Sequence, residues 1–574
     1  MENIIFLVFR RMRRPLLILL STYSITVLGL VLIPGVDAAG NPWHMDFFHA
    51  FYFISFTATT IGFGEIPYEF TDGQRLWVII SIYSTVVVWI YAIGNLLRLI
   101  QDRAFQQAVT ERRFARLIQR QRQSFILVCG YGETGSALVR ALTDRHQHVV
   151  VIDINPERVS MLKLENLRQY VPALCGDAAR PIHLLEAGLE HPLCEGVVAV
   201  TNFNEVNLKV AITSKLLHPD IKVICRADSH DVEANMGSFG TNYIIDPYDS
   251  FANHLATALQ TPGLYLLAEW ITGIRYQQLK PPIFPPREGL WIVCGYGRFG
   301  QAVYRRLKEE GIEPVVIEAT PEKTGLPSGE SVRGRGTEAV TLEEAGIHSA
   351  VGLVAGTDDD ANNLSIIMTA REMKPDLFVV ARQNMDENLR LFDAVQADVV
   401  MHPSSIIANK IRVLLGTPLL HEFLSLSVYN DDDWACELIS RITALVNTEV
   451  PEIWELKISA DTTYAISGAL DRGRVITLSN LISDPRERDR LLPCIPLLLL
   501  RGSTRTTMPP EDTQLKQGDR LLVCGSFAAL GRMEWTLQND HALSYILTGQ
   551  ARPQGWFWRW LSRKGANGKV AADH

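Results

Sequence analysis

The chain has 574 residues, which is enough for three or four domains. Its hydrophobic content of 47% is too low for a protein that lies mostly in a membrane, and its net charge of −8 gives no indication of nucleic-acid binding. None of the eight cysteines belongs to a CxxC pair, and all of them follow the apolar N-terminal region. The sequence therefore favours reduced thiols in the cytosol over disulfides or a zinc site.

The apolar runs cluster at the start of the chain and predict a transmembrane pore domain over residues 1–100. The uncharged runs Pro15–Pro34 and Leu76–Leu97 are long enough to cross a bilayer, and they predict spanning helices at about 15–35 and 76–100. A third uncharged run, predicted as a helix over 47–59, is too short to cross and suits a re-entrant pore helix. Irregular backbone is expected after this run. At membrane depth such backbone is tolerated only where it is buried in protein or lines a water-filled path.

Basic residues flank both long runs and set the expected orientation. Because arginines precede the first run and follow the second, both ends of the chain are expected in the cytoplasm. We interpret the N-terminus as part of the pore rather than a cleaved signal peptide. The loop between the runs is acidic, and its charges either concentrate cations or are simply solvated; they are Asp37, Asp46, Glu65, Glu69 and Asp72. Only one uncharged helix precedes the pore helix, so the sequence contains no voltage sensor.

The segment Thr60-Ile61-Gly62-Phe63-Gly64 resembles the selectivity filter of the potassium channel family, usually Thr-Val-Gly-Tyr-Gly followed by Asp. Glycines at alternate positions permit the required backbone angles. The resemblance implies that four copies of the chain, a homotetramer, aim main-chain carbonyls at a K⁺ ion. Phe63 and Glu65 depart from the usual pattern, but they leave the number of carbonyls unchanged, so K⁺ remains favoured over Na⁺.

The second spanning helix lacks the usual hinge glycine about twenty residues after the filter. Gly94 is its only glycine, so a bend is expected there or independently of glycine. Leu96 and Leu97 either form a hydrophobic gate or face lipid and neighbouring helices. The charge-rich stretch 101–124 has apolar residues at helical spacing, which predicts an amphipathic linker helix that transmits gating.

An internal repeat fills the cytosolic part. Phe125–Gly135 recurs as Leu290–Gly300, and further matches follow at regular offsets. In each copy a GxGxxG sequence ends an apolar strand and opens a helix, and an acid ends the next strand. This arrangement predicts a parallel α/β dinucleotide-binding (Rossmann) fold, with pyrophosphate at the helix N-terminus and the acid on the ribose.

The predicted ligand is NAD or ADP rather than NADP, because Asp153 and Glu318 would repel a 2′-phosphate. A copy that keeps its glycines for turn packing alone remains the alternative for each site. The residues expected at the first site are Gly130, Tyr131, Gly132, Glu133, Thr134, Gly135, Asp153, Ile154, Asp177, Thr201 and Asn202. Those expected at the second are Gly295, Tyr296, Gly297, Arg298, Phe299, Gly300, Glu318, Ala319 and Thr357.

This organisation resembles the RCK, or TrkA-N, domains that form the gating ring of ligand-gated potassium channels. The resemblance implies Rossmann lobes, crossover helices that clasp a partner domain, and an α+β TrkA-C-like lobe after the second copy only. The expected boundaries are 125–246 for the first Rossmann lobe, 247–286 for its crossover helices and link, 287–402 for the second lobe, 403–428 for its crossover helices, 429–545 for the TrkA-C-like lobe and 546–574 for a tail.

Three features are ambiguous. The acid clusters Asp358–Asp360 and Asp431–Asp433 are either calcium ligands or, more simply, a helix cap and a solvated loop. The aromatic and basic segment Gly555–Trp560 suits a membrane interface or packing against the ring.

The sequence therefore predicts a non-enzymatic, nucleotide-gated K⁺ channel of the cell (inner) membrane. The alternatives are a membrane-anchored NAD-dependent oxidoreductase, which would need a catalytic domain, and a regulatory subunit of a potassium transporter, which would need no re-entrant loop.

Overall fold

The computed structural model describes residues 2–273 and 277–550. Contacts along the chain separate it into two compact units. The first consists chiefly of the residues up to Gln121 and the second of nearly all that follow.

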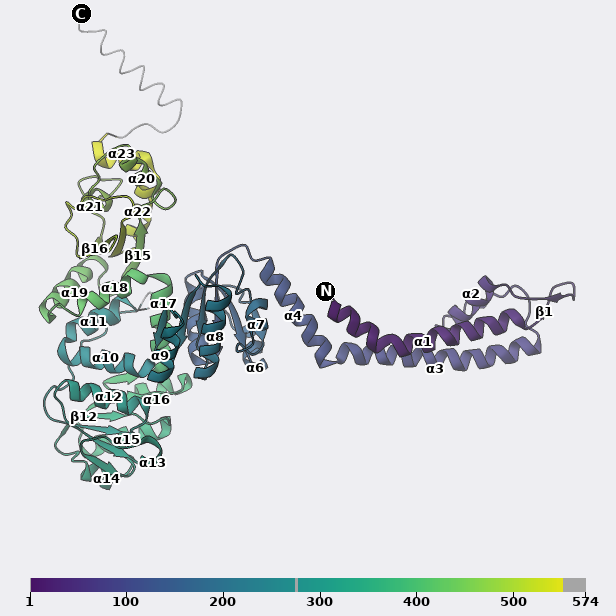
Figure 1. Ribbon diagram of the computed structural model, residues 1–574, viewed down its shortest axis with the longest axis horizontal. Helices are drawn as coiled ribbons and strands as arrows, with labels where there is room; N and C mark the ends of the chain where they lie inside the picture. Colours follow the sequence, from purple (N-terminus) through teal and green to yellow (C-terminus); the bar gives the residue numbers. More distant parts are fainter. Residues whose placement is uncertain (1, 274–276, 551–574) are drawn as a thin grey trace, which may run out of the picture. The chain divides into compact units, whose positions relative to one another are not determined.

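The first unit contains two long apolar helices. Its elements are α1 (Glu2–Leu32), β1 (Gly35–Val36), β2 (Pro42–Trp43), α2 (Phe47–Ala58), α3 (Asp72–Gln101) and α4 (Arg103–Gln119). Met12–Leu32 and Asp72–Gln101 are long and apolar enough to cross a membrane. Helices α1 and α3 run side by side (Figure 1), and the Trp77 indole donates a hydrogen bond to the carbonyl of Thr26 at 3.0 Å.

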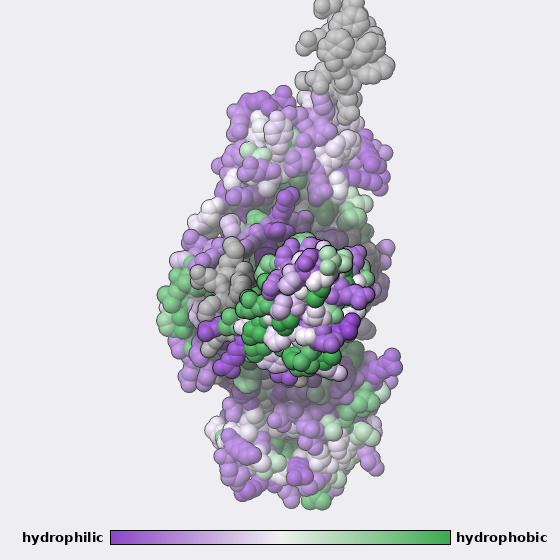
Figure 2. Space-filling model, turned by 90° about the vertical axis from the view of Figure 1, so that its right-hand side faces the viewer, coloured by the Kyte–Doolittle hydropathy of each residue, from purple (hydrophilic) through white to green (hydrophobic). Residues whose placement is uncertain are grey.

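Apolar side chains cover the outside of these helices. Leu20, Leu32, Leu76 and Ile90 are each more than 60% exposed. Green hydrophobic residues are visible on the face that Figure 2 turns toward the viewer. Such a surface is unfavourable in water and suits lipid or neighbouring helices.

The short helix α2 packs against the long pair. Asp46 caps it by accepting a hydrogen bond from the His49 N–H at 2.9 Å. Phe53 and Phe56 are buried with Val27 and Leu30 of α1 in one apolar cluster. This packing fixes the start of the segment that follows α2.

The second unit begins with a Rossmann lobe whose six strands are parallel, in the order β5-β4-β3-β6-β7-β8. Its strands are β3 (Phe125–Cys129), β4 (His148–Asp153), β5 (Ala173–Cys175), β6 (Cys194–Ala199), β7 (Lys222–Arg226) and β8 (Tyr243–Ile245). Its helices are α5 (Glu133–Asp144), α6 (Pro156–Leu164), α7 (Pro181–Glu186), α8 (Asn204–Leu217) and α9 (His230–Ser238).

The second Rossmann lobe repeats this topology in the order β11-β10-β9-β12-β13-β14. Its strands are β9 (Leu290–Cys294), β10 (Pro314–Glu318), β11 (Ser331–Arg333), β12 (Ala350–Ala355), β13 (Phe378–Arg382) and β14 (Val399–Met401). Its helices are α12 (Arg298–Glu309), α13 (Pro321–Thr324), α14 (Ala339–Glu344), α15 (Asp360–Met373), the 3₁₀ turn η1 (Asp386–Asn388) and α16 (Leu389–Ala394). The central strands are buried on both faces, as expected for parallel sheets covered by helices. The predicted α/β class is confirmed.

The crossover helices exchange partners between the two lobes. They are α10 (Pro247–Gln260), α11 (Pro262–Ile271), α17 (Pro403–Gly416) and α18 (Pro418–Ser427). Phe251 and Leu255 of α10 pack with Phe299 of the second lobe, whereas Ile411 of α17 packs with Leu142 of the first. Each lobe is therefore completed by a helix that follows the other lobe's fold. The domain that the first helix of each crossover pair contacts is thus the other Rossmann lobe of the same chain.

The C-terminal lobe contains an antiparallel four-stranded sheet in the order β15-β18-β16-β17. Its elements are α19 (Asp432–Val446), β15 (Glu452–Lys457), α20 (Tyr464–Asp471), α21 (Leu478–Ile482), β16 (Cys494–Arg501), β17 (Thr504–Thr507), β18 (Arg520–Gly525), α22 (Phe527–Gln538) and α23 (Asp540–Thr548). One apolar cluster joins the sheet to α20–α23, and another joins it to α11, α18 and α19. The lobe has the α+β composition expected after the second copy.

Candidate functional site

The segment Thr60–Gly64 leaves α2 with an unusual backbone. The φ angles are +62° at Thr60, +66° at Gly62 and +74° at Gly64. In an ordinary strand successive carbonyls point to opposite sides, whereas left-handed angles at every second residue turn them toward one side. The N–H groups of Ile61 and Gly62 donate to the carbonyl of Phe56, at 2.9 and 3.3 Å. The local geometry is compatible with a line of carbonyl oxygens.

The two departures from the usual filter sequence both contact α2. The Tyr52 hydroxyl donates to the Glu65 carboxylate at 3.1 Å. The Phe63 ring lies edge-on to Phe56, with 6.1 Å between centroids. Helical spacing in the sequence places Tyr52 and Phe56 on one face of α2, so the pattern contained this signal although Tyr52 was not predicted as a site residue.

The predicted gate residues lie near the C-terminal end of α3. Leu96 and Leu97 are 44% and 52% exposed, and a Cβ added at Gly94 would contact nothing. The Asn95 side chain donates back to the carbonyl of Tyr91 at 2.8 Å. The assignment of a gate to these residues remains a prediction.

In the first Rossmann lobe, the glycine loop and Asp153 lie together at the carboxyl ends of β3 and β4. The carboxylate accepts hydrogen bonds from the N–H groups of Tyr131 at 2.5 Å and Asn155 at 2.7 Å. Arg158 lies 3.9 Å from the same carboxylate. A Cβ at Gly135 would lie 2.0 Å from the carbonyl oxygen of Gly130, so this loop requires glycine.

The remaining predicted residues of this copy differ in their hydrogen-bond partners and in their exposure to solvent. Thr201 donates to Asn207 at 2.8 Å, and Asn202 accepts from Arg226 at 2.9 Å. Asp177 caps a turn through the N–H of Ala179. Side chains at three of the predicted positions differ in exposure: Thr134 and Tyr131 are buried, and Ile154 is 68% exposed.

Glu133 makes the first glycine loop acidic on its outer side. Burial raises the pKa of the Glu133 carboxyl, and the nearby Asp386 carboxyl of the second lobe raises this pKa further. His402 lies 2.7 Å from Asp386. A phosphate at this loop would meet like charge.

The second lobe contains a cavity of about 600 Å³ at the carboxyl ends of its strands. Predicted residues that line it are Gly295, Gly297, Arg298, Glu318, Ala319 and Thr357. Sequence reasoning missed three further cations in its wall, namely Lys323, Arg335 and Arg382, and also Tyr248 from the first lobe's crossover helix. A cavity of this size with several cations suits a phosphate-bearing small molecule.

Three of the expected second-site residues, Tyr296, Phe299 and Gly300, do not line this cavity. Phe299 is fully buried with Phe251 and Val303 in the core. A Cβ at Gly300 would lie 1.9 Å from the carbonyl oxygen of Gly295, which gives Gly300 a role in packing the turn. The Tyr296 N–H donates to Glu318 at 2.6 Å, and the Tyr296 ring lies beside Tyr304.

Glu318 remains ionised in this setting. Burial raises its pKa, but hydrogen bonds from the Tyr296 N–H and from the N–H and hydroxyl of Thr320 outweigh burial, so the pKa lies below its usual value. An ionised carboxylate has about four acceptor positions, and Glu318 uses three of them for these bonds, with the Thr324 hydroxyl as a further donor nearby.

The acid clusters have structural partners. Asp359 caps α15 through the N–H of Asn362, and Asp360 accepts hydrogen bonds from Asn384 and Asn388. Asp431 caps α19, and Asp432 accepts from the N–H of Gly263 at 2.6 Å. Within residues 2–273 and 277–550 no group of three or more His, Cys, Asp or Glu side chains is placed to hold a metal ion. The calcium expectation gains no support.

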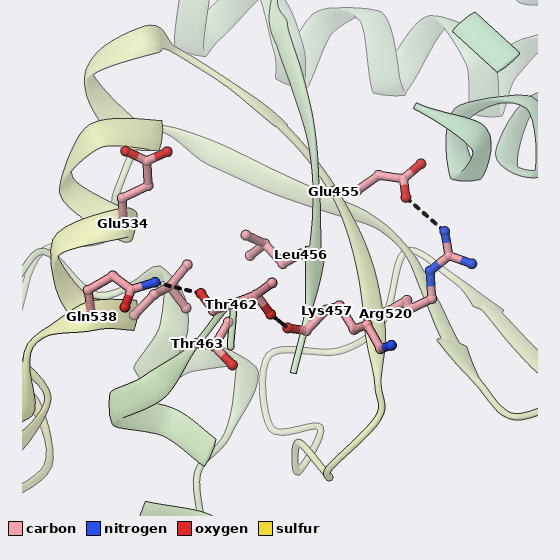
Figure 3. A pocket seen from close by; sticks show the side chains of 9 residues that line it. Glu455, Leu456, Lys457, Thr462, Thr463, Arg520, Glu534 and Gln538 are labelled. Atoms are coloured by element: carbon pink, nitrogen blue, oxygen red, sulfur yellow. Dashed lines mark hydrogen bonds and ion pairs between the residues drawn. The ribbon is translucent and has the colours of Figure 1, made fainter. Parts of the chain in front are cut away.

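A separate cavity of about 610 Å³ lies beside β15 in the C-terminal lobe (Figure 3). Arg520 pairs with Glu455 at 2.9 Å, and Gln538 donates to the carbonyl of Thr462 at 2.7 Å. Much of its polar lining is thus engaged within the lobe. The aromatic segment Gly555–Trp560 lies outside the described residues.

Comparison with known proteins identifies two kinds of module. The family model described as TrkA-N domain matches residues 126–247 and 291–403, and the model described as ion channel matches residues 16–102. These matches confirm the expected ion channel module and the expected repeat.

Two curated relatives come from Methanocaldococcus jannaschii. Probable potassium channel protein 2 is 24% identical over 220 residues, covering 38% of this chain and 63% of that protein. Potassium channel protein 1 is 26% identical over 203 residues, covering 35% of this chain and 59% of that protein. The chain thus spans less than two thirds of the length of the curated relatives it matches first. A solved structure of the GsuK channel bound to NAD aligns with 93% of this chain and 99% of that chain, at 17% identity and a TM-score of 0.45.

Proposed function

We propose that this chain, which carries an ion channel domain followed by two TrkA-N domains, is a potassium-selective channel gated by a cytosolic nucleotide. In the proposed assembly four chains surround one pore, and the Thr60–Gly64 carbonyls replace the water shell of K⁺. The observation that carries this proposal is the alternation of positive φ angles at residues 60, 62 and 64 directly after the capped helix α2. The names of both M. jannaschii relatives, which are potassium channel proteins, support K⁺ as the permeant ion.

The proposed location is the cell (inner) membrane, with both termini and both TrkA-N domains in the cytoplasm. Two apolar helices in the described chain and the arginines that flank them support this topology.

The second lobe is the proposed nucleotide site. Its cavity combines the glycine loop with Glu318 for a ribose and four cations for phosphates: Arg298, Lys323, Arg335 and Arg382. The first lobe has Glu133 where the second has Arg298, and Glu133 faces Asp386. Electrostatics therefore favour NAD or ADP in the second lobe over the first.

We infer that the nucleotide regulates the protein and does not take part in hydride transfer. The ion channel domain in the same chain is the part that nucleotide binding would regulate. A ligand opens or closes such a pore only by binding one state of the ring better than the other. The same domain favours a channel over the regulatory subunit of a transporter.

Potassium flux from proteoliposomes, with NAD and ADP added in turn, tests the proposal. The expected result is K⁺ flux that one of these nucleotides changes. Purified protein that passes no K⁺ under either nucleotide would overturn it.

A further inference from the structure

The first lobe supplies an aromatic wall to the cavity of the second lobe. Tyr248 lies in the first turn of helix α10, two residues after the capping residue Asp246, and is 5% exposed. Two guanidinium groups that line the cavity lie over its ring: the Cζ atoms of Arg298 and Arg382 are 5.4 and 5.2 Å from its centroid. A cation at this distance from an aromatic face is attracted to it. One side chain thus positions two arginines.

Arg298 is oriented by a second group from the first lobe. It forms an ion pair with the Asp228 carboxylate, and its Nη1 donates to the Asp228 carbonyl at 3.2 Å. The Asp228 side chain is only 5% exposed, so this carboxylate is largely shielded from solvent. A guanidinium carries five N–H donors, and those not directed at Asp228 remain available to a ligand.

Arg382 has an unused donor. Its Nε–H is buried and has no acceptor in the described part of the chain, and Nη2 reaches only the Tyr248 hydroxyl, at 3.5 Å. A buried N–H left without an acceptor is unfavourable, by about 1–3 kcal/mol. The cavity beside it is where an acceptor would be placed.

The corresponding place in the first lobe lacks this arrangement. Pro247 and Pro403 occupy equal positions in the repeat, so Ser404 stands where Tyr248 stands. Glu133 replaces Arg298. Arg226, the counterpart of Arg382, also has a buried Nε–H without an acceptor in the described part of the chain, but its guanidinium donates to Asn202 at 2.9 Å and lies 3.7 Å from Asp228.

We propose that Tyr248 is a positioning residue that holds Arg298 and Arg382 together as a clamp for the pyrophosphate of the nucleotide in the second lobe. This rests on the proposed function, and it adds a ligand class: the site selects diphosphate-containing nucleotides over the nucleoside. It also makes the first lobe part of the second lobe's site, because Tyr248 is carried by α10.

The test measures binding of ADP and of adenosine to the purified full-length channel by isothermal titration. Tyr248→Leu removes the ring, and we expect ADP to bind about tenfold more weakly, consistent with the loss of two cation–aromatic contacts. Adenosine affinity should be unchanged, because the clamp contacts only phosphates. Tyr248→Phe keeps the ring and should retain most of the ADP affinity. Ser404→Ala, at the matching position of the first lobe, is the control and should change neither affinity.

Two results would overturn the clamp while leaving the proposed function intact. One is unchanged ADP affinity in Tyr248→Leu. The other is an equal loss of ADP and adenosine affinity, which would indicate general damage to the cavity. If the unmodified channel binds no ADP at all, the nucleotide site itself is refuted, and the clamp with it.

Discussion

Replacing Arg298 with glutamine tests which lobe receives the nucleotide. Arg298 lines the second cavity and stands where the first lobe has Glu133. Arg298→Gln removes the charge from the glycine loop but keeps a side chain that can donate a hydrogen bond. The matched control is Glu133→Gln, which alters the same position in the other copy.

The expected magnitude follows from the surroundings of Arg298. Its side chain is 56% exposed, so solvent screening keeps the contribution near the middle of the range for charge-assisted hydrogen bonds, about 2 kcal/mol. A loss of about 2 kcal/mol corresponds to a roughly 30-fold weaker nucleotide affinity. Moving a tetrameric pore from about 1% to 99% open takes roughly 5.5 kcal/mol of differential binding, or about 1.4 kcal/mol for each of four subunits.

The assay is K⁺ flux from proteoliposomes as a function of ADP concentration. We expect the half-maximal concentration to rise roughly 30-fold in Arg298→Gln and to stay unchanged in Glu133→Gln. Because Arg298 also pairs with Asp228, a thermal melt of each variant controls for general loss of the interlobe contact. An unchanged response in Arg298→Gln together with a shifted response in Glu133→Gln would refute the assignment to the second lobe.

Three further outcomes are expected. Tyr52→Phe removes the hydrogen bond to Glu65 behind the filter segment and should loosen it, lowering the K⁺/Na⁺ permeability ratio in bilayer recordings; an unaltered ratio would show that this bond does not hold the filter. Leu97→Asp should raise K⁺ flux without nucleotide if Leu97 lines the gate, and equal basal flux would remove that assignment. Because burial and Asp386 raise the pKa of Glu133, its ionised form destabilises the folded state above that pKa. Glu133→Gln should therefore raise the melting temperature at neutral pH, with a gain that shrinks as the pH falls through the raised pKa, and a pH-independent gain would contradict this origin.

The segments with regular apolar patterns and with glycines at fixed spacing were enough to predict the modules. Glycines at fixed spacing after an apolar strand admit few folds, so both Rossmann lobes and the α/β class followed from residues such as Gly130 and Gly295. The short helix α2 and the glycine-containing segment after it followed similarly, from the length of the apolar run and the two glycines.

The features that depend on tertiary packing could not be predicted from the sequence. Tyr248 belongs to the first lobe by sequence, and only the packing of α10 on the second lobe brings it to the cavity. Lys323 and Arg335 lie on separate connections with no local pattern that marks them. Phe299, by contrast, follows the fingerprint closely but points into the core, because the first turn of α12 must also cover the sheet.

The most direct test of the central claim is the reversal potential of single channels in a planar bilayer, with K⁺ on one side, Na⁺ on the other, and ADP added to the cytosolic face. The account predicts a reversal potential near that of a purely K⁺-selective pore and an open probability that changes with ADP. A reversal potential near zero, or activity indifferent to the nucleotide, would contradict it.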